Sequence, residues 1–146
     1  MLYKKILIAI DGGHHANAVI KTALELAKVT HAEIGLIHVL NPAIATVNLE
    51  VGMVNETMVQ VILKQGENII NNAVKHCTGF TLTEFLPWGT PGTEILNVAQ
   101  DWGADLIVLG THAQTRLERF FMGSVAEHVV NRCSVSVLVV PERIEK

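Results

Sequence analysis

The sequence has few residues of the kinds that define disulfide-rich, nucleic-acid-binding or membrane proteins. Its 146 residues include only two cysteines, Cys77 and Cys133, without the C-x-x-C spacing of a metal or redox site. We therefore expect both to be buried thiols. Eleven basic residues against fourteen acidic ones give a net charge of −3 and leave no basic stripe for nucleic acid. The first apolar run ends at Asp11, too short for a signal peptide or a membrane span, which favours a cytoplasmic protein that does not bind membranes.

Apolar residues are abundant enough for one core, at 49% of the chain. A chain of this length buries roughly 68–70% of its unfolded surface, so residues 1–146 are expected to form a single domain. Five short apolar runs alternate with four helical patterns, which predicts an α/β fold with a parallel sheet covered on both faces. The runs are Lys5–Asp11, Glu33–Val39, Thr81–Pro87, Asp105–Thr111 and Val135–Val140.

Apolar spacings of three and four residues predict the four helices. The first spans Ala16–Ala27, and the second runs from about Asn55 to His76 with an interruption at Gly66. Thr90 and Pro91 are typical of a helix start and Gly103 of a helix end, which delimits the third. The fourth runs from Ser124 to about Arg132. The residues expected to face the core include Val61, Ile62 and Ile70 of the second helix and Val125, Val129 and Val130 of the fourth.

The first and fourth apolar runs are continuous, as in strands buried on both faces, so we place them side by side at the centre. Thr81–Phe85 alternates instead, which suits an edge strand. Right-handed crossovers then give an open, doubly wound, Rossmann-like sheet of order 3-2-1-4-5. In such sheets ligands bind where the strand order reverses, here between the loops that begin at Asp11 and at Gly110.

The fourth run leads into Gly110-Thr111-His112-Ala113, and nine residues later Gly123-Ser124 opens a helix. This pattern resembles the signature of the universal stress protein family, in which a glycine, two residues, a second glycine, nine residues and a Gly-Ser or Gly-Thr pair hold the phosphates of ATP. The resemblance covers essentially the whole chain. It implies an adenine nucleotide as ligand, either AMP or ATP, the latter with Mg²⁺ accompanying it.

The resemblance assigns phosphate binding to the two glycine-containing segments. It places Asp11 near the base and ribose and Val39 against the adenine. The residues expected to contact the nucleotide are Ala9, Asp11, Gly12, Val39, Gly110, His112, Ala113, Arg116, Gly123, Ser124 and Val125. Phosphate binding also has a physical basis, because the first turn of a helix has unpaired N–H groups and carries about half a positive charge.

Several residues keep two interpretations. Ser124 can donate its hydroxyl to a phosphate, or it can cap the helix in the capping box Ser124–Glu127. Asp11 can accept from a nucleotide hydroxyl or amine, or it can be a turn or cap residue. Ala113 replaces the family's second glycine, which costs on the order of 1–2 kcal/mol if the residue is left-handed. Arg116 can compensate by reaching phosphate oxygens, or it can be solvated.

The function predicted from these residues is a stress-response regulator that senses an adenine nucleotide and signals to a protein partner. No nucleophile–base pair is spaced for catalysis, so at most weak ATP hydrolysis is expected. Ala113 motivates an alternative, a family scaffold that does not bind nucleotide. His14, His15 and His112 could lie near Asp11, which motivates a third, a metal-dependent hydrolase. The remaining histidines, His31, His38, His76 and His128, are expected at the surface or hydrogen-bonded.

Two further segments suggest interactions. Val135–Val140 is apolar yet lies on an open edge, so either a second copy or the chain's own tail should cover it. The family resemblance implies a homodimer that pairs through this strand. Asn41–Val54 is a long connection with little helical pattern, and such loops are often functional, so it could close over the nucleotide.

Overall fold

The computed structural model describes residues 3–48, 53–54, 56–111 and 123–141. Five parallel strands form one open sheet in the order β5-β2-β1-β6-β7, which is the 3-2-1-4-5 order expected from the five apolar runs. The predicted fold class is therefore confirmed. The strands are β1 (Lys5–Ala9), β2 (Glu33–Ile37), β5 (Leu82–Phe85), β6 (Leu106–Gly110) and β7 (Ser136–Val140).

The central strands are buried because their side chains reach core on both faces of the sheet. Ile6, Leu7 and Ile8 of β1 are all completely buried. Successive side chains of a strand point to opposite faces, so Ile6 and Ile8 join one apolar cluster and Leu7 joins another. This two-sided burial explains why the first and fourth apolar runs show no alternation.

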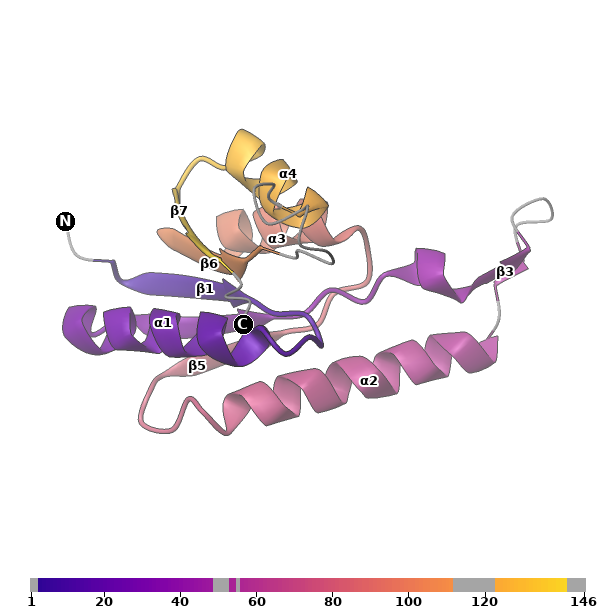
Figure 1. Ribbon diagram of the computed structural model, residues 1–146, viewed down its shortest axis with the longest axis horizontal. Helices are drawn as coiled ribbons and strands as arrows, with labels where there is room; N and C mark the ends of the chain where they lie inside the picture. Colours follow the sequence, from indigo (N-terminus) through magenta and orange to yellow (C-terminus); the bar gives the residue numbers. More distant parts are fainter. Residues whose placement is uncertain (1–2, 49–52, 55, 112–122, 142–146) are drawn as a thin grey trace, which may run out of the picture.

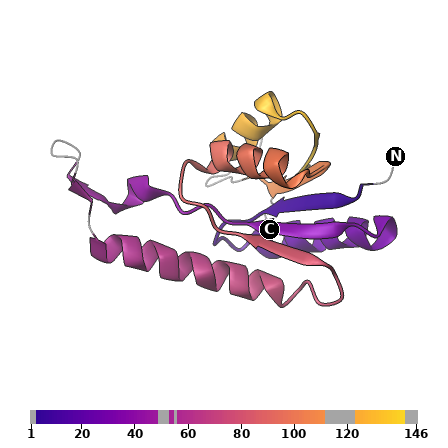
Figure 2. The same ribbon diagram turned by 180° about the vertical axis from the view of Figure 1, so that it is seen from behind.

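Two helices cover each face of the sheet (Figures 1 and 2). Helices α1 (Ala16–Thr30) and α2 (Glu56–Val74) lie on one face, and α3 (Pro91–Trp102) and α4 (Ser124–Arg132) lie on the other. The predicted limits of α3 are confirmed: Thr90 is its N-cap, and Gly103 ends it with a left-handed φ of 81° that glycine adopts at low cost.

Helix α2 is continuous, so the expected interruption at Gly66 is wrong. Gly66 is buried, and a β-carbon at this position would overlap Leu40 Cδ2. The glycine therefore serves close packing between α2 and the segment after β2, not a break in the helix. Val61 was expected to face the core, yet 39% of its surface is exposed.

The connection Asn41–Val54 has more regular structure than expected. It contains a short 3-10 helix, η1 (Pro42–Ala45), and two antiparallel strands, β3 (Thr46–Asn48) and β4 (Met53–Val54). Both ribbon views place β3 beyond the carboxyl ends of the sheet strands, near the start of α2 (Figures 1 and 2). Closure of this segment over a ligand stays a prediction.

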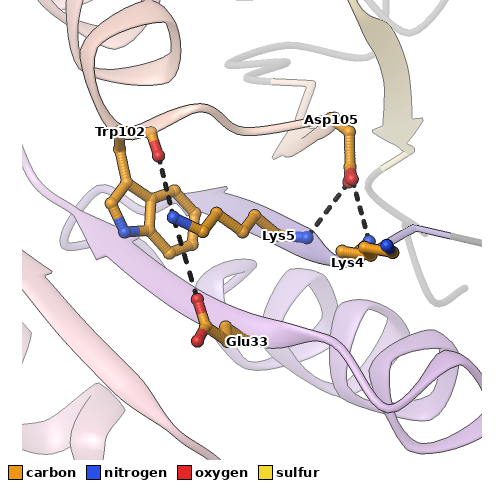
Figure 3. Close-up of polar contacts among 5 residues, drawn as sticks. All are labelled: Lys4, Lys5, Glu33, Trp102 and Asp105. Atoms are coloured by element: carbon orange, nitrogen blue, oxygen red, sulfur yellow. Dashed lines mark hydrogen bonds and ion pairs between the residues drawn. The ribbon is translucent and has the colours of Figure 1, made fainter.

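The opposite, amino-terminal end of the sheet is tied together by polar contacts (Figure 3). The Asp105 carboxylate accepts from the main-chain amides of Lys4, at 2.9 Å, and of Lys5, at 3.2 Å. The Lys5 ammonium donates to the Trp102 carbonyl at 3.1 Å and lies 5.2 Å from the centre of that indole ring. These contacts join β1 to the α3–β6 connection at the end of the sheet far from the carboxyl edge.

Two further burial expectations need correction. Cys77 is buried, as expected, but Cys133 is only half-buried because it follows the last turn of α4 at the outer edge of the sheet. Val130 has 36% of its surface exposed, because it lies on the outer side of α4 while Val129 takes the core position. Within the described ranges, no helix has the length and apolar content needed to cross a bilayer.

Candidate functional site

A cavity of about 870 Å³ lies at the carboxyl ends of β1, β2 and β6, where the strand order reverses. This is the location at which open α/β sheets bind ligands. Its walls come from the strand ends, the segments at the starts of α1, α3 and α4, and one side of α2 from Met58 to Ile69. The lining residues are Ala9, Ile10, Asp11, Gly12, His15, Ala16, Val19, Ile37, His38, Val39, Asn41, Met58, Val61, Ile62, Gln65, Ile69, Pro91, Ile95, Leu109, Gly110, Thr111, Gly123, Ser124, Val125 and Ala126.

The fold brings most of the predicted site residues to this cavity. They arrive from four separate parts of the chain: the end of β1, the end of β2, the end of β6 and the start of α4. Those that line the cavity are Ala9, Asp11, Gly12, Val39, Gly110, Gly123, Ser124 and Val125. The other three predicted residues, His112, Ala113 and Arg116, lie outside the described residues. The effect of alanine at position 113 is therefore still a prediction.

The first turn of α4 differs from the predicted capping box. The N-cap is Gly123, with φ −62° and ψ 161°, and its carbonyl accepts from the Glu127 amide at 2.9 Å. Ser124 is instead the first helical residue and is exposed, and no side chain of the described chain caps this helix. The capping interpretation of Ser124 is therefore wrong, because the glycine already adopts the extended conformation that a cap needs.

The amides at the start of α4 suit an anion. Among the described residues, none accepts a hydrogen bond from the amides of Ser124, Val125 or Ala126. All three residues line the cavity. Unpaired amides at a helix start, together with the helix dipole, favour a negatively charged group.

Asp11 combines a turn role with a place in the cavity wall. Its Oδ1 accepts from the Gly13 amide at 2.9 Å, which is the turn that Asp commonly makes with its own backbone. The structure thus bears out the turn interpretation. The next residue, Gly12, lies under α2, where a β-carbon would come within 3.1 Å of Ile69 Cδ1. This packing sets the loop after β1 against the wall formed by α2.

That wall was missed in the sequence, where α2 was expected only to cover the sheet. Five α2 residues line the cavity: Met58, Val61, Ile62, Gln65 and Ile69. One signal was available: Val61 directly precedes Ile62 and so lies off the narrow stripe of Ile62, Gly66, Ile70 and Ala73 that faces the core. An apolar side chain beside such a stripe indicates a second apolar surface on the helix, and in this structure Val61 lines the cavity.

Two histidines of the cavity wall donate to main-chain carbonyls. His15 Nε2 donates to the Val140 carbonyl at 2.8 Å, and His38 Nδ1 donates to the Ile10 carbonyl at 3.0 Å. The expectation that His38 is hydrogen-bonded is confirmed. His14 is exposed and does not line the cavity, so the predicted convergence of the two adjacent histidines is wrong.

The described part of the chain contains no set of side chains that could coordinate a metal ion. No three histidine, cysteine, aspartate or glutamate side chains gather there in a way that could hold an ion. His112, the third histidine considered for such a site, lies outside the described residues. The cavity instead offers amides on one side and apolar side chains on the other, which fits a ligand with an anionic end and a flat apolar end.

Comparisons with known proteins agree on one family. The family model described as "Universal stress protein family" matches residues 2–141. The chain is similar to universal stress protein MJ0531 of Methanocaldococcus jannaschii, with 35% identity over 95% of this chain and 82% of the relative. It is also similar to the solved structure of MJ0577 from the same organism, with a TM-score of 0.84 and 27% identity over 99% of this chain and 100% of the other.

Two other solved structures share the fold and contain nucleotides. One is a universal stress protein in complex with cAMP, with a TM-score of 0.64 and 19% identity over 97% of this chain and 98% of that one. The other is the universal stress protein from Archaeoglobus fulgidus in complex with dAMP, with a TM-score of 0.63 and 22% identity over 96% and 99%. At these identities the likeness shows the common fold.

Proposed function

The chain belongs to the universal stress protein family, and on that premise we propose that its cavity binds an adenine nucleotide, ATP or AMP. The observation that carries the proposal is the group of three adjacent amides at the start of α4 that line the cavity without an acceptor in the described chain. Phosphate is the anion of a nucleotide, and a helix start is suited to it.

The remaining walls fit adenosine. Val39 and Ile37 line the cavity and would supply apolar surface for the base, and Asp11, which also lines it, would accept from a ribose hydroxyl. Micromolar affinity corresponds to about 8 kcal/mol, which a buried base and several charge-assisted hydrogen bonds can supply. Mg²⁺ would have to arrive with ATP, because Asp11 is the single carboxylate among the described lining residues.

The two nucleotide complexes of related fold support an adenine ligand. One of those proteins binds cAMP and the other dAMP. Adenine is common to both, whereas the phosphate and the sugar differ. Recognition of the base combined with tolerance at the phosphate end is therefore the behaviour that we propose for this chain.

The proposed role is regulation in the cytoplasm, not catalysis. The titratable side chains of the described cavity wall are Asp11, His15 and His38, and each makes a hydrogen bond with the main chain. They are therefore suited to shaping the cavity more than to activating water, so ATP hydrolysis is weak at most. The apolar edge strand β7 would pair with its copy in a homodimer, through which a nucleotide-dependent state reaches a protein partner.

The direct test is to identify and titrate the ligand. Purified protein is denatured and the released small molecules are analysed by mass spectrometry. ATP, AMP, adenosine and GTP are then titrated by calorimetry. We expect an adenine nucleotide in the extract, micromolar affinity for ATP or AMP, and no comparable affinity for GTP. Absence of any released nucleotide together with no heat from the adenine ligands would contradict the proposal and favour the scaffold alternative.

A substitution at Ser124 tests the phosphate end. Ser124→Ala removes a hydroxyl beside the three amides, and we expect a roughly threefold to tenfold weaker affinity for ATP with adenosine binding unchanged. Because Ser124 is not the N-cap, the melting temperature should not fall as it does on loss of a cap. Ser134→Ala is the matched control, an exposed serine just before β7, at the other end of the sheet. Equal ATP affinities for the two variants would remove Ser124 from the site.

A further inference from the structure

His15 joins three segments that are distant in the sequence. It directly precedes α1, and its Nε2 donates to the carbonyl of Val140, the last residue of β7, at 2.8 Å. A carbonyl can only accept, so Nε2 must carry the hydrogen and the tautomer of the neutral ring is set. The side chain makes no cap bond to α1, so capping that helix does not account for its position.

The Val140 carbonyl accepts a second hydrogen bond, from the amide of Thr111 at 3.1 Å. His15 and the end of β6 thus share one acceptor at the end of β7. The ring also lies against the main chain of Gly110, where a β-carbon would come within 2.6 Å of His15 Cδ2 and 3.0 Å of Val19 Cγ2. A side chain at position 110 would therefore collide with the His15 ring, which explains the glycine there.

Most of the residues that make these contacts line the cavity, although Val140 itself does not. His15, Gly110 and Thr111 line the cavity together, on the side where the chain leaves β6. A ring held at one nitrogen by a carbonyl and packed on a glycine has little rotational freedom. Loss of the ring would remove one of the two side chains packed against the Gly110 main chain, leaving Val19, and would leave the Val140 carbonyl with one donor fewer.

We infer that His15 is a positioning residue for the phosphate end of the nucleotide site. Through its contacts with Val140 and Gly110 it holds the main chain of Gly110 and Thr111, at the end of β6, in place beside the cavity. This inference rests on the proposed nucleotide binding. It deepens that proposal by separating the phosphate end, which depends on His15 through its contacts with Val140 and Gly110, from the adenosine end at Asp11 and Val39, which make neither contact.

Two amide variants remove the ring and differ in whether they keep the hydrogen bond to Val140. The amide nitrogen of His15→Gln takes the place of Nε2 and can donate to Val140, whereas the amide of His15→Asn takes the place of Nδ1 and falls short. His14→Ala is the matched control, because His14 is adjacent, exposed and absent from the cavity wall. Calorimetry with ATP, AMP and adenosine, and a melting temperature without ligand, are measured for each protein.

We expect His15→Asn to lower the affinities for ATP and AMP by about fivefold to tenfold, as loss of one positioning hydrogen bond predicts. The affinity for adenosine should change by less than about twofold. His15→Gln should recover most of the ATP affinity, and His14→Ala should equal the parent protein. A merely structural role would lower all three affinities, or the melting temperature, without changing their ratio. An unchanged ratio of ATP to adenosine affinity in His15→Asn, or a Gln variant as weak as the Asn variant, would overturn the inference.

One measurement needs no variant and covers the case in which His15→Asn fails to fold. In the parent protein, the imidazole ¹⁵N resonances of His15 should shift on addition of AMP and much less on addition of adenosine. Equal shifts with both ligands would contradict the positioning role. If the parent protein binds none of the three ligands, the proposed function itself fails and the inference fails with it, whereas parent binding with an unchanged ratio overturns the inference alone.

Discussion

The close packing of α2 at Gly66 gives a stability prediction whose sign depends on one neighbour. Replacing glycine by alanine inside a helix normally stabilises it by about 1 kcal/mol. Here the new methyl would overlap Leu40 Cδ2 and would lie 3.2 Å from His38 Cδ2 and 3.3 Å from Leu86 Cδ1. Favourable carbon contacts lie at about 3.5–4.0 Å, so all three neighbours would have to move.

Leu40 has little room to do so, because only 1% of its surface is exposed and it packs against Ile62. Overpacking of this kind costs about 1–3 kcal/mol, which exceeds the helix gain. We therefore expect Gly66→Ala to destabilise the protein by roughly 1 kcal/mol. Because α2 carries Val61 and Ile69 into the cavity wall, nucleotide affinity should fall as well.

A double-mutant cycle with Leu40→Ala isolates the clash. Removing the Leu40 methyl groups eliminates the shortest of the three contacts and leaves space into which His38 and Leu86 can shift by a few tenths of an ångström. Gly66→Ala should then stabilise the Leu40→Ala protein by about 1 kcal/mol, the helix gain alone. The coupling free energy between the two sites is then about 2 kcal/mol. Urea denaturation of the four proteins measures it. If Gly66→Ala has the same sign in both backgrounds, the packing argument is refuted.

Two further predictions concern the end of the sheet opposite the cavity and the two thiols. Asp105→Ala should lower the free energy of unfolding by about 1–2 kcal/mol, because its carboxylate accepts hydrogen bonds from the amides of Lys4 and Lys5. The control Asp101→Ala, at an exposed α3 position, should change the free energy of unfolding little. Equal losses in the two variants would contradict the prediction. Burial raises the pKa of the Cys77 thiol, so a thiol reagent at pH 8 should label the half-buried Cys133 first and Cys77 only slowly, and labelling of Cys77 at the faster rate would refute this. Because the pKa of this thiol is raised on folding, the unfolded chain loses the Cys77 proton first as the pH rises. The stability that the thiol contributes should therefore be complete below about pH 9 and decline above it. Cys77→Ser should remove that part of the decline.

The strand order could be predicted because it rests on local patterns. Ile6, Leu7 and Ile8 form a continuous apolar run, which indicates burial on both faces, and helix patterns between the runs require parallel crossovers. The limits of α3 followed from Pro91 and Gly103 for the same reason, since each residue restricts or permits particular main-chain angles. The position of the cavity then follows from topology alone.

The misjudged roles of Gly66 and His15 depend on a neighbour distant in the sequence, whereas that of Ser124 depends on the residue next to it. Gly66 looks like a helix interruption until Leu40 is placed beside it. Ser124 has the sequence of a capping residue, but the conformation of Gly123 takes that role. His15 resembled a candidate metal ligand, and its contact with Val140 spans 125 residues. Neither Leu40 nor Val140 leaves a signal within a short window of sequence around Gly66 or His15.

The sheet, the order of its strands and the loops that meet at its carboxyl edge can be predicted from local sequence, because apolar periodicity and main-chain restrictions act between near neighbours. The side chains that form the cavity wall can be identified only in the folded chain. The packing of α2 against the strand ends, and the single carbonyl shared by His15 and Thr111, exist only once segments far apart in the chain are brought together. Periodicity indicates that a side chain is buried, whereas its partner is set by close packing in three dimensions.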